Sequence, residues 1–249
     1  MVDVTVLMSV HKRPYTFDEQ YASILNQTYQ NMDYLIWANP PIGTDIPDYI
    51  KLHPKTYYSE QELGVWARFN IAQSFQTPYI CIIDDDIIPG HKWIENCRNV
   101  IEKDGVGVVT TRGVLANYGK DHTYPSPSSY EAFGWCNPNE EIKQVDMGCH
   151  CWFFHKNMLF EFWKNAPKPM PKNFGEDMHL SYIAQKYGLG TYVAPHPKDD
   201  WEMWGNSPVT GDKYGSDKNA ISWNNEANKG MNEYWNHLKS IGFKILAEQ

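Results

Sequence analysis

The chain has 249 residues, of which 42% are hydrophobic and 14% aromatic, and its formal net charge at pH 7 is -8. This size and composition are typical of a globular protein with one large or two small domains and a buried core. The negative charge argues against non-specific binding to nucleic acid, and no apolar run approaches the roughly 18 residues that a membrane-spanning helix needs.

Expected strands and helices alternate from residue 2 to residue 112. Short apolar runs predict strands at residues 4–10, 34–38, 55–58, 79–83 and 106–111. Helical patterns occur at residues 17–26, 63–75 and 92–103. This alternation predicts an α/β fold with a parallel sheet covered by helices.

The pattern changes after Arg112. Residues 117–139 are rich in Pro, Ser, Gly and Tyr and predict a long loop, which in a compact domain is usually functional. Residues 199–229 are polar and predict an irregular lid. The remaining expected elements are strands at residues 142–154 and 191–193 and helices at residues 156–163, 177–187 and 232–241.

Three adjacent carboxylates, Asp84, Asp85 and Asp86, follow the apolar run at residues 79–83. Residues 89–90, a Pro-Gly pair that interrupts regular secondary structure, come shortly after them. The carboxylates therefore lie at the carboxyl end of a central strand, where open α/β sheets bind ligands. Adjacent carboxylates repel one another, and a hard divalent cation with oxygen ligands removes that repulsion. The alternative interpretation is a solvated acidic turn.

The five cysteines show neither a disulfide framework nor a paired C-x-x-C motif. Cys149, His150 and Cys151 could indicate zinc, but strand alternation would turn His150 away from both cysteines. We expect free thiols in a reducing compartment. Because no signal peptide precedes the first expected strand, we also expect a soluble, cytoplasmic protein.

Several motifs, in this order and spacing, resemble the family 2 glycosyltransferases of the GT-A fold. They are Thr5-Val6-Leu7-Met8-Ser9-Val10, Arg13-Pro14, Ser23-Ile24-Leu25-Asn26-Gln27-Thr28-Tyr29, Gly64-Val65-Trp66-Ala67-Arg68-Phe69-Asn70, Asp84-Asp85-Asp86, Gly175-Glu176-Asp177 and Tyr192-Val193-Ala194-Pro195-His196-Pro197. The resemblance extends over residues 4–196.

The resemblance implies a GT-A fold, with a Rossmann-like mixed sheet and helices on both faces, in a single domain of residues 1–249. Residues 1–112 would form the nucleotide-sugar-binding half, and residues 113–249 the acceptor-binding half with a C-terminal lid. The implied activity is metal-dependent, inverting transfer of a hexosyl or deoxyhexosyl group from a UDP-linked sugar to a glycan hydroxyl.

The resemblance implies that Asp86 is the carboxylate nearest the metal, Mn²⁺ or Mg²⁺. Asp84 points the same way and would hold the ribose or reach the metal through water, whereas alternation turns Asp85 away. His196, fixed between two prolines, is the expected imidazole ligand, which would favour manganese. The alternative is that His196 is a surface loop residue.

The expected nucleotide-binding residues lie after successive strands and on the helix before the acidic strand. They are Ser9, Val10, Asn39, Arg68, Asp84 and Asp85. Asn39 stands where the family often has an aspartate for the uracil ring, which leaves the preference for uridine open. The forked guanidinium of Arg68 suits phosphate oxygens or a base carbonyl, with a surface salt bridge as the alternative.

Glu176 and Asp177 begin an expected helix after Gly175. The resemblance indicates that Asp177 is the general base that deprotonates the acceptor hydroxyl, and that Glu176 is the alternate or binds acceptor hydroxyls. The alternative is a helix-capping role, because carboxylates at a helix N-terminus are stabilised by the helix dipole.

Two other functions are consistent with some of these features. A sugar-nucleotide pyrophosphorylase shares the sheet, but no Gly-rich loop follows the first strand. A non-catalytic carbohydrate-binding module fits the aromatic content and leaves the two acidic clusters without a role. The released product, a nucleoside diphosphate, pyrophosphate or neither, distinguishes the three.

Overall fold

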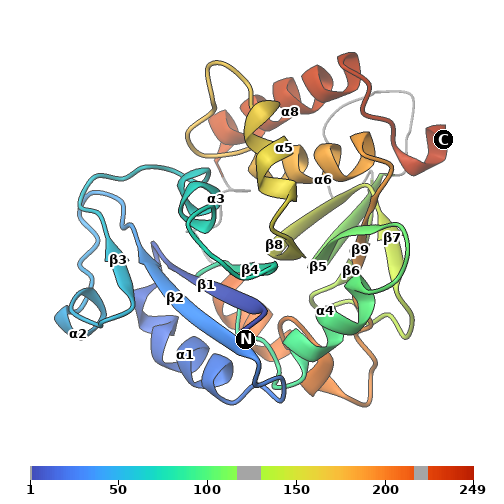
Figure 1. The fold of residues 1–249 in the computed structure, drawn as a ribbon. Helices are drawn as coiled ribbons and strands as arrows, with labels where there is room; N and C mark the ends of the chain where they lie inside the picture. Colours follow the sequence, from blue (N-terminus) through green and yellow to red (C-terminus); the bar gives the residue numbers. More distant parts are fainter. Residues whose placement is uncertain (1, 117–129, 216–223) are drawn as a thin grey trace.

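The structure is a computed structural model that describes residues 2–116, 130–215 and 224–249 (Figure 1). Within these residues nine strands form one sheet of order β3-β2-β1-β4-β8-β5-β9-β7, with β6 paired to β5. The strands are β1 (Val4–Val10), β2 (Met32–Ala38), β3 (Thr56–Tyr58), β4 (Tyr79–Ile83), β5 (Val106–Ala116), β6 (Tyr130–Gly134), β7 (Lys143–Val145), β8 (Met147–His155) and β9 (Gly190–Val193).

Helices cover both faces of this sheet (Figure 1). They are α1 (Phe17–Leu25), α2 (Asp48–Lys51), α3 (Ala67–Ala72), α4 (Trp93–Ile101), α5 (Met158–Lys164), α6 (Glu176–Lys186), α7 (Pro208–Thr210) and α8 (Asn225–Ser240). Short 3-10 or π-helical turns lie at Pro14–Thr16, Trp201–Met203, Gly211–Gly215 and Leu246–Glu248. None of the described helices has both the length and the apolar character needed to cross a bilayer.

The sheet is mixed. Strand β1 runs parallel to β2 and β4, whereas β8 is antiparallel to both of its neighbours, β4 and β5. All seven residues of β1 are buried, as expected for a parallel strand with helices on both faces. The predicted α/β class, with a Rossmann-like mixed sheet of the GT-A type, is therefore confirmed.

Each face of the sheet has its own hydrophobic core. One contains Phe17 and Ile24 from α1 and Trp93 from α4. The other joins α3, α5, α6 and α8, with Phe69 and Trp235 among its fully buried side chains. Figure 1 shows these four helices together on one side of the sheet. Strand β4 lies between both cores, and the acidic cluster follows its last residue.

The second half differs from the expected pattern. Two strands, β7 and β8, replace the single strand expected at residues 142–154. They are separated at Asp146, whose carboxylate accepts the N–H groups of Ala116 (2.7 Å) and Leu246 (2.6 Å). Strand β5 continues to Ala116, and β6 lies inside the segment expected to be a loop. The rest of that loop, residues 117–129, lies outside the described residues.

The last helix begins earlier than expected, within the polar segment predicted to be a lid. The side-chain oxygen of Asn224 accepts the N–H groups of Glu226 (2.9 Å) and Ala227 (3.1 Å), which caps α8. Trp235 and Leu238 then anchor the helix in the core. Of the expected lid, residues 216–223 are not among those described. The part before them contains short helical turns at Trp201–Met203, Pro208–Thr210 and Gly211–Gly215 with irregular backbone between Met203 and Pro208.

We predict that Asn224→Ala destabilises the protein by about 1 kcal/mol through loss of the cap of α8. For a chain of this size, that corresponds to a fall in Tm of roughly 2–4 °C. Asn224→Ser retains a capping oxygen and serves as the control in thermal unfolding followed by circular dichroism. Equal Tm values for the Ala and Ser variants would show that the cap contributes nothing.

Candidate active site

The three aspartates form a turn whose backbone is held by side chains from distant elements. Gln20 donates to the carbonyl oxygens of Asp84 and Ile87, both at 2.8 Å. Asn206, in the predicted lid, accepts the N–H of Ile88 (3.0 Å) and donates to the carbonyl of Asp86 (3.4 Å). The N–H of Asp84 donates to the carbonyl of His150 in β8 (3.0 Å). The carboxylates therefore sit on a fixed backbone.

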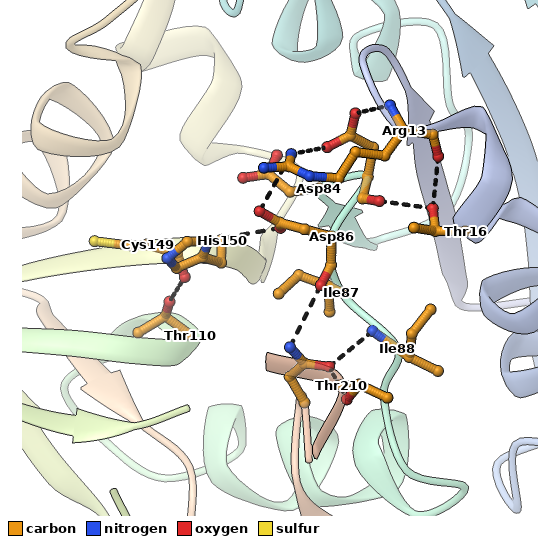
Figure 2. Close-up of polar contacts among 12 residues, drawn as sticks. Arg13, Thr16, Asp84, Asp86, Ile87, Ile88, Thr110, Cys149, His150 and Thr210 are labelled. Atoms are coloured by element: carbon orange, nitrogen blue, oxygen red, sulfur yellow. Dashed lines mark hydrogen bonds and ion pairs between the residues drawn. The ribbon is translucent and has the colours of Figure 1, made fainter. Parts of the chain in front are cut away.

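Asp84, Asp86 and His150 form a candidate metal site (Figure 2). One potential ligand atom from each lies within 4.8 Å of the others. His150 Nδ1 is 3.7 Å from Asp86 Oδ1, too far for a hydrogen bond, and that oxygen is buried without a hydrogen-bond partner among the described residues. Two carboxylates and an imidazole suit manganese, so the residues present fit the expected cation.

His150 reaches this position through an unusual backbone conformation. Its φ is 68°, and its ring packs on Trp135 with 4.3 Å between the ring centroids. This residue interrupts the alternation of β8, so that Cys149 packs in one core and Cys151 in the other. The expectation that both cysteines share a face opposite His150 was wrong. All five cysteines are free thiols, as expected.

Asp85 faces away from this group, as alternation predicted, and binds the loop after β1. Its carboxylate accepts the backbone N–H groups of Lys12 (2.7 Å) and Arg13 (3.0 Å) and the guanidinium of Arg13 (2.9 Å). The same guanidinium lies 3.5 Å from Asp86. Asp85 therefore fixes a loop and an arginine, and its carboxylate is not free to bind a nucleotide.

Arg68 connects the two acidic clusters. Its guanidinium binds Asp84 through Nη1 and Glu176 through Nη2, and it lies over the ring of Trp152 at 4.7 Å. Trp152 is 1% exposed and belongs to the core. Arg68 is 9% exposed, so it does not form the surface salt bridge of the alternative interpretation.

The carboxylates of the cluster differ in their electrostatic environment. Burial raises the pKa of Asp84 well above its usual value, with Asp86 and Glu176 adding to the rise, although Arg68 opposes it. Burial acts on Asp86 in the same direction, but His150 and Arg13 outweigh it and lower the pKa of Asp86. Asp86 is therefore ionised near neutral pH and has an oxygen available to a cation.

Glu176 and Asp177 begin α6 after Gly175, whose φ of 93° suits glycine. Glu176 is buried against Arg68, whereas Asp177 is half-buried and accepts only the N–H of Met178 (2.7 Å) among the described residues. Burial, and then the charge of Glu176, raise the pKa of Asp177 to about 7. Asp177 is therefore the more available carboxylate and is basic enough to accept a proton at neutral pH.

His196 does not join the candidate metal site. The ring is completely buried between Trp93 and Trp204, with Nδ1 on the carbonyl of Ala194 (2.7 Å) and Nε2 accepting the N–H of Gly205 (3.2 Å). Burial lowers its pKa to about 4. Since both ring nitrogens have protein partners, His150 replaces His196 in the candidate set. Neither a metal nor a surface-loop role describes His196, which is a core residue.

Some of the residues expected to bind the nucleotide base are instead occupied by contacts within the protein. Asn39 donates to the carbonyls of Ser59 (3.2 Å) and Gln61 (2.7 Å) and accepts the N–H of Leu63 (2.8 Å), so its amide fixes a loop and is not free for a pyrimidine. The carbonyl of Val10 accepts the N–H of Asn39 (3.0 Å). The hydroxyl of Ser9 is buried without a partner among the described residues.

We predict that Asp85→Ala destabilises the fold by about 3 kcal/mol, because it leaves Arg13 without its closest buried partner. The expected fall in Tm is roughly 6–12 °C. Manganese binding, measured by calorimetry below the transition, should persist because Asp84, Asp86 and His150 remain. A variant with wild-type Tm that no longer binds manganese would instead make Asp85 a ligand.

Comparison with known protein families gives one match. The family described as Glycosyl transferase family 2 matches residues 5–162, which include β1, the acidic cluster and His150. No curated protein matches the chain significantly. The match favours the predicted glycosyltransferase over a pyrophosphorylase or a silent binding module. The chain belongs to glycosyl transferase family 2 and is a glycosyltransferase that takes its sugar from a nucleotide-sugar donor and passes it to an acceptor.

Proposed function

We propose that this enzyme transfers a hexosyl or deoxyhexosyl group from a UDP-linked donor to a hydroxyl group of a glycan, with a divalent metal and with inversion of the anomeric centre. The observation that carries the proposal is the position of the Asp84, Asp86 and His150 group beside the Arg68–Glu176 pair, with half-buried Asp177 at the start of α6. The choice of UDP rests on the family resemblance alone.

At the donor end, Asp84, Asp86 and His150 would hold the metal, and manganese suits this mixed oxygen and nitrogen set. A metal bound there would supply positive charge to the diphosphate leaving group. Arg13 and Arg68 hold the carboxylates at this end of the sheet in place, Arg13 through Asp85 and Asp86 and Arg68 through Asp84 and Glu176.

At the acceptor end, Asp177 takes the proton of the attacking hydroxyl. Its half-buried position leaves the carboxylate accessible, and a pKa of about 7 matches a base that works near neutral pH. Direct attack of that hydroxyl on the anomeric carbon inverts the configuration. Glu176, paired to Arg68, positions the start of α6.

We predict that UDP binds more tightly with manganese than with chelator, and that this difference disappears in Asp86→Ala and His150→Ala. Removing a ligand should weaken metal binding by at least the roughly 10–100-fold that outer-shell changes cause. His91→Ala removes an exposed histidine that pairs with Glu202 and is not part of the group, so it is the matched control. Calorimetric titration is the measurement, and equal UDP affinity with manganese and with chelator would contradict metal dependence.

We predict that Asp177→Asn lowers turnover by roughly two to four orders of magnitude while manganese and UDP affinity stay near wild type, because the amide keeps the shape and loses the basicity. Turnover is followed as released UDP, and the product anomer is identified by NMR.

Glu176→Gln is the matched comparison for Asp177→Asn. It should act more on acceptor affinity and on the Arg68 contact than on proton transfer. Full activity of Asp177→Asn, or a product that retains the configuration of the donor, would refute the assignment of the base and of inversion.

A further inference from the structure

Arg112, in β5, differs from the other arginines of the chain in its partners. The others each contact two carboxylates: Arg13 with Asp85 and Asp86, Arg68 with Asp84 and Glu176, and Arg98 with Asp3 and Glu102. Within the described part of the chain, Arg112 forms no ion pair. Its Nη2 donates to the hydroxyl of Tyr130 at 3.1 Å.

The register of the sheet places Arg112 on the face that carries α6. Arg112 pairs with Cys149, and Val114 pairs with Met147, across β5 and β8. Val114, Ala116 and Met147 pack in the core that includes α6. Because side chains two apart in a strand share a face, Arg112 lies on the same face as Val114. Asp177 begins α6 over that face.

Arg112 also lies near the candidate active site. Asp84 follows β4, His150 is in β8, and Arg112 is in β5, so the three come from adjacent strands. The N–H of Gly148 donates to the hydroxyl of Ser181 in α6 (3.2 Å), and that hydroxyl donates to the carbonyl of Asp177 (3.1 Å). Since Arg112 pairs with Cys149, the residue after Gly148, the first turn of α6 lies close to this part of β8 and β5.

A half-buried guanidinium has lost part of its hydration, and one neutral hydroxyl replaces little of it. The remaining N–H groups suit a planar or tetrahedral oxyanion, which they bind through two parallel hydrogen bonds. In the order of strands, Arg112 lies on the far side of His150 from Asp84, on the face of the sheet that α6 covers.

We propose that Arg112 binds a carboxylate or phosphate group of the substrate, so that this enzyme selects an anionic sugar over its neutral counterpart. The inference rests on the proposed function, because it assumes that the sugar or the acceptor occupies the space beside Asp177. The charged group belongs either to the transferred sugar, as in a uronic acid, or to a phosphorylated acceptor.

Binding to the manganese-loaded protein, at fixed ionic strength, tests this in two arms. The donor arm compares UDP-glucuronic acid with UDP-glucose by calorimetry. The acceptor arm compares glucose 6-phosphate with glucose by ligand-observed NMR in the presence of UDP. In the wild type we expect the anionic member of one arm to bind roughly tenfold tighter or more, because hydrogen bonds to charged groups are the strong ones.

Arg112→Gln should abolish that preference and leave the affinity for UDP and for the neutral member unchanged. Arg112→Lys keeps the positive charge but not the forked guanidinium, and should keep part of the preference. If the glutamine variant does not fold, the preference of the lysine variant decides the question. Arg98→Gln, which removes an arginine remote from the site, is the matched control and should behave as wild type.

The proposal is overturned if the wild type shows no preference in either arm, or if Arg112→Gln keeps the wild-type preference. If UDP bound neither the wild type nor any of the variants, the assigned donor would be refuted instead. In that case the acceptor arm is run without UDP and still decides the role of Arg112.

Discussion

The site depends on the pairing of two buried arginines with carboxylates that would otherwise repel one another. Arg68 joins α3 to Asp84 and to Glu176 at the start of α6, and Arg13 lies between Asp85 and Asp86. An unpaired buried charge costs several kcal/mol, so each arginine is required where it is. The carboxylates still outnumber the guanidinium groups, and burial, with the charges of Asp86 and Glu176 adding to it, raises the pKa of Asp84. A divalent cation bound at Asp86, as proposed above, would offset this excess of negative charge.

Much of the fold follows from local patterns that tertiary contacts do not override. The bounds of β1 and β4 agree with those expected, because a β-branched apolar run buried on both faces has few alternatives. The acidic turn after β4 and the acidic pair at the start of α6 were predictable for the same reason, since each sits at a well-marked end of an element. The roles given to Asp86 and Asp177 came from the family resemblance.

Contacts between residues that are far apart in the chain could not be predicted from the sequence. His196 has the sequence setting of a ligand, yet two tryptophans and two backbone groups occupy its ring. Asn39 follows the right strand, but its amide is used by a loop more than twenty residues later. The sequence does not indicate His150 as a metal ligand, because regular strand alternation is expected there and the left-handed backbone of His150 interrupts it. Asn224 is followed by Asn225 in a polar tract, and the local sequence does not show which residue caps the helix.

The left-handed backbone of His150 limits which residues evolution can place there. Histidine, asparagine and aspartate occur at positive φ more often than most side chains, and β-branched residues are rare outliers. The residues that suit this backbone therefore overlap with those that bind metals. A relative without the proposed metal site would still be expected to keep a small polar residue or glycine at this position, because an isoleucine there would strain the backbone.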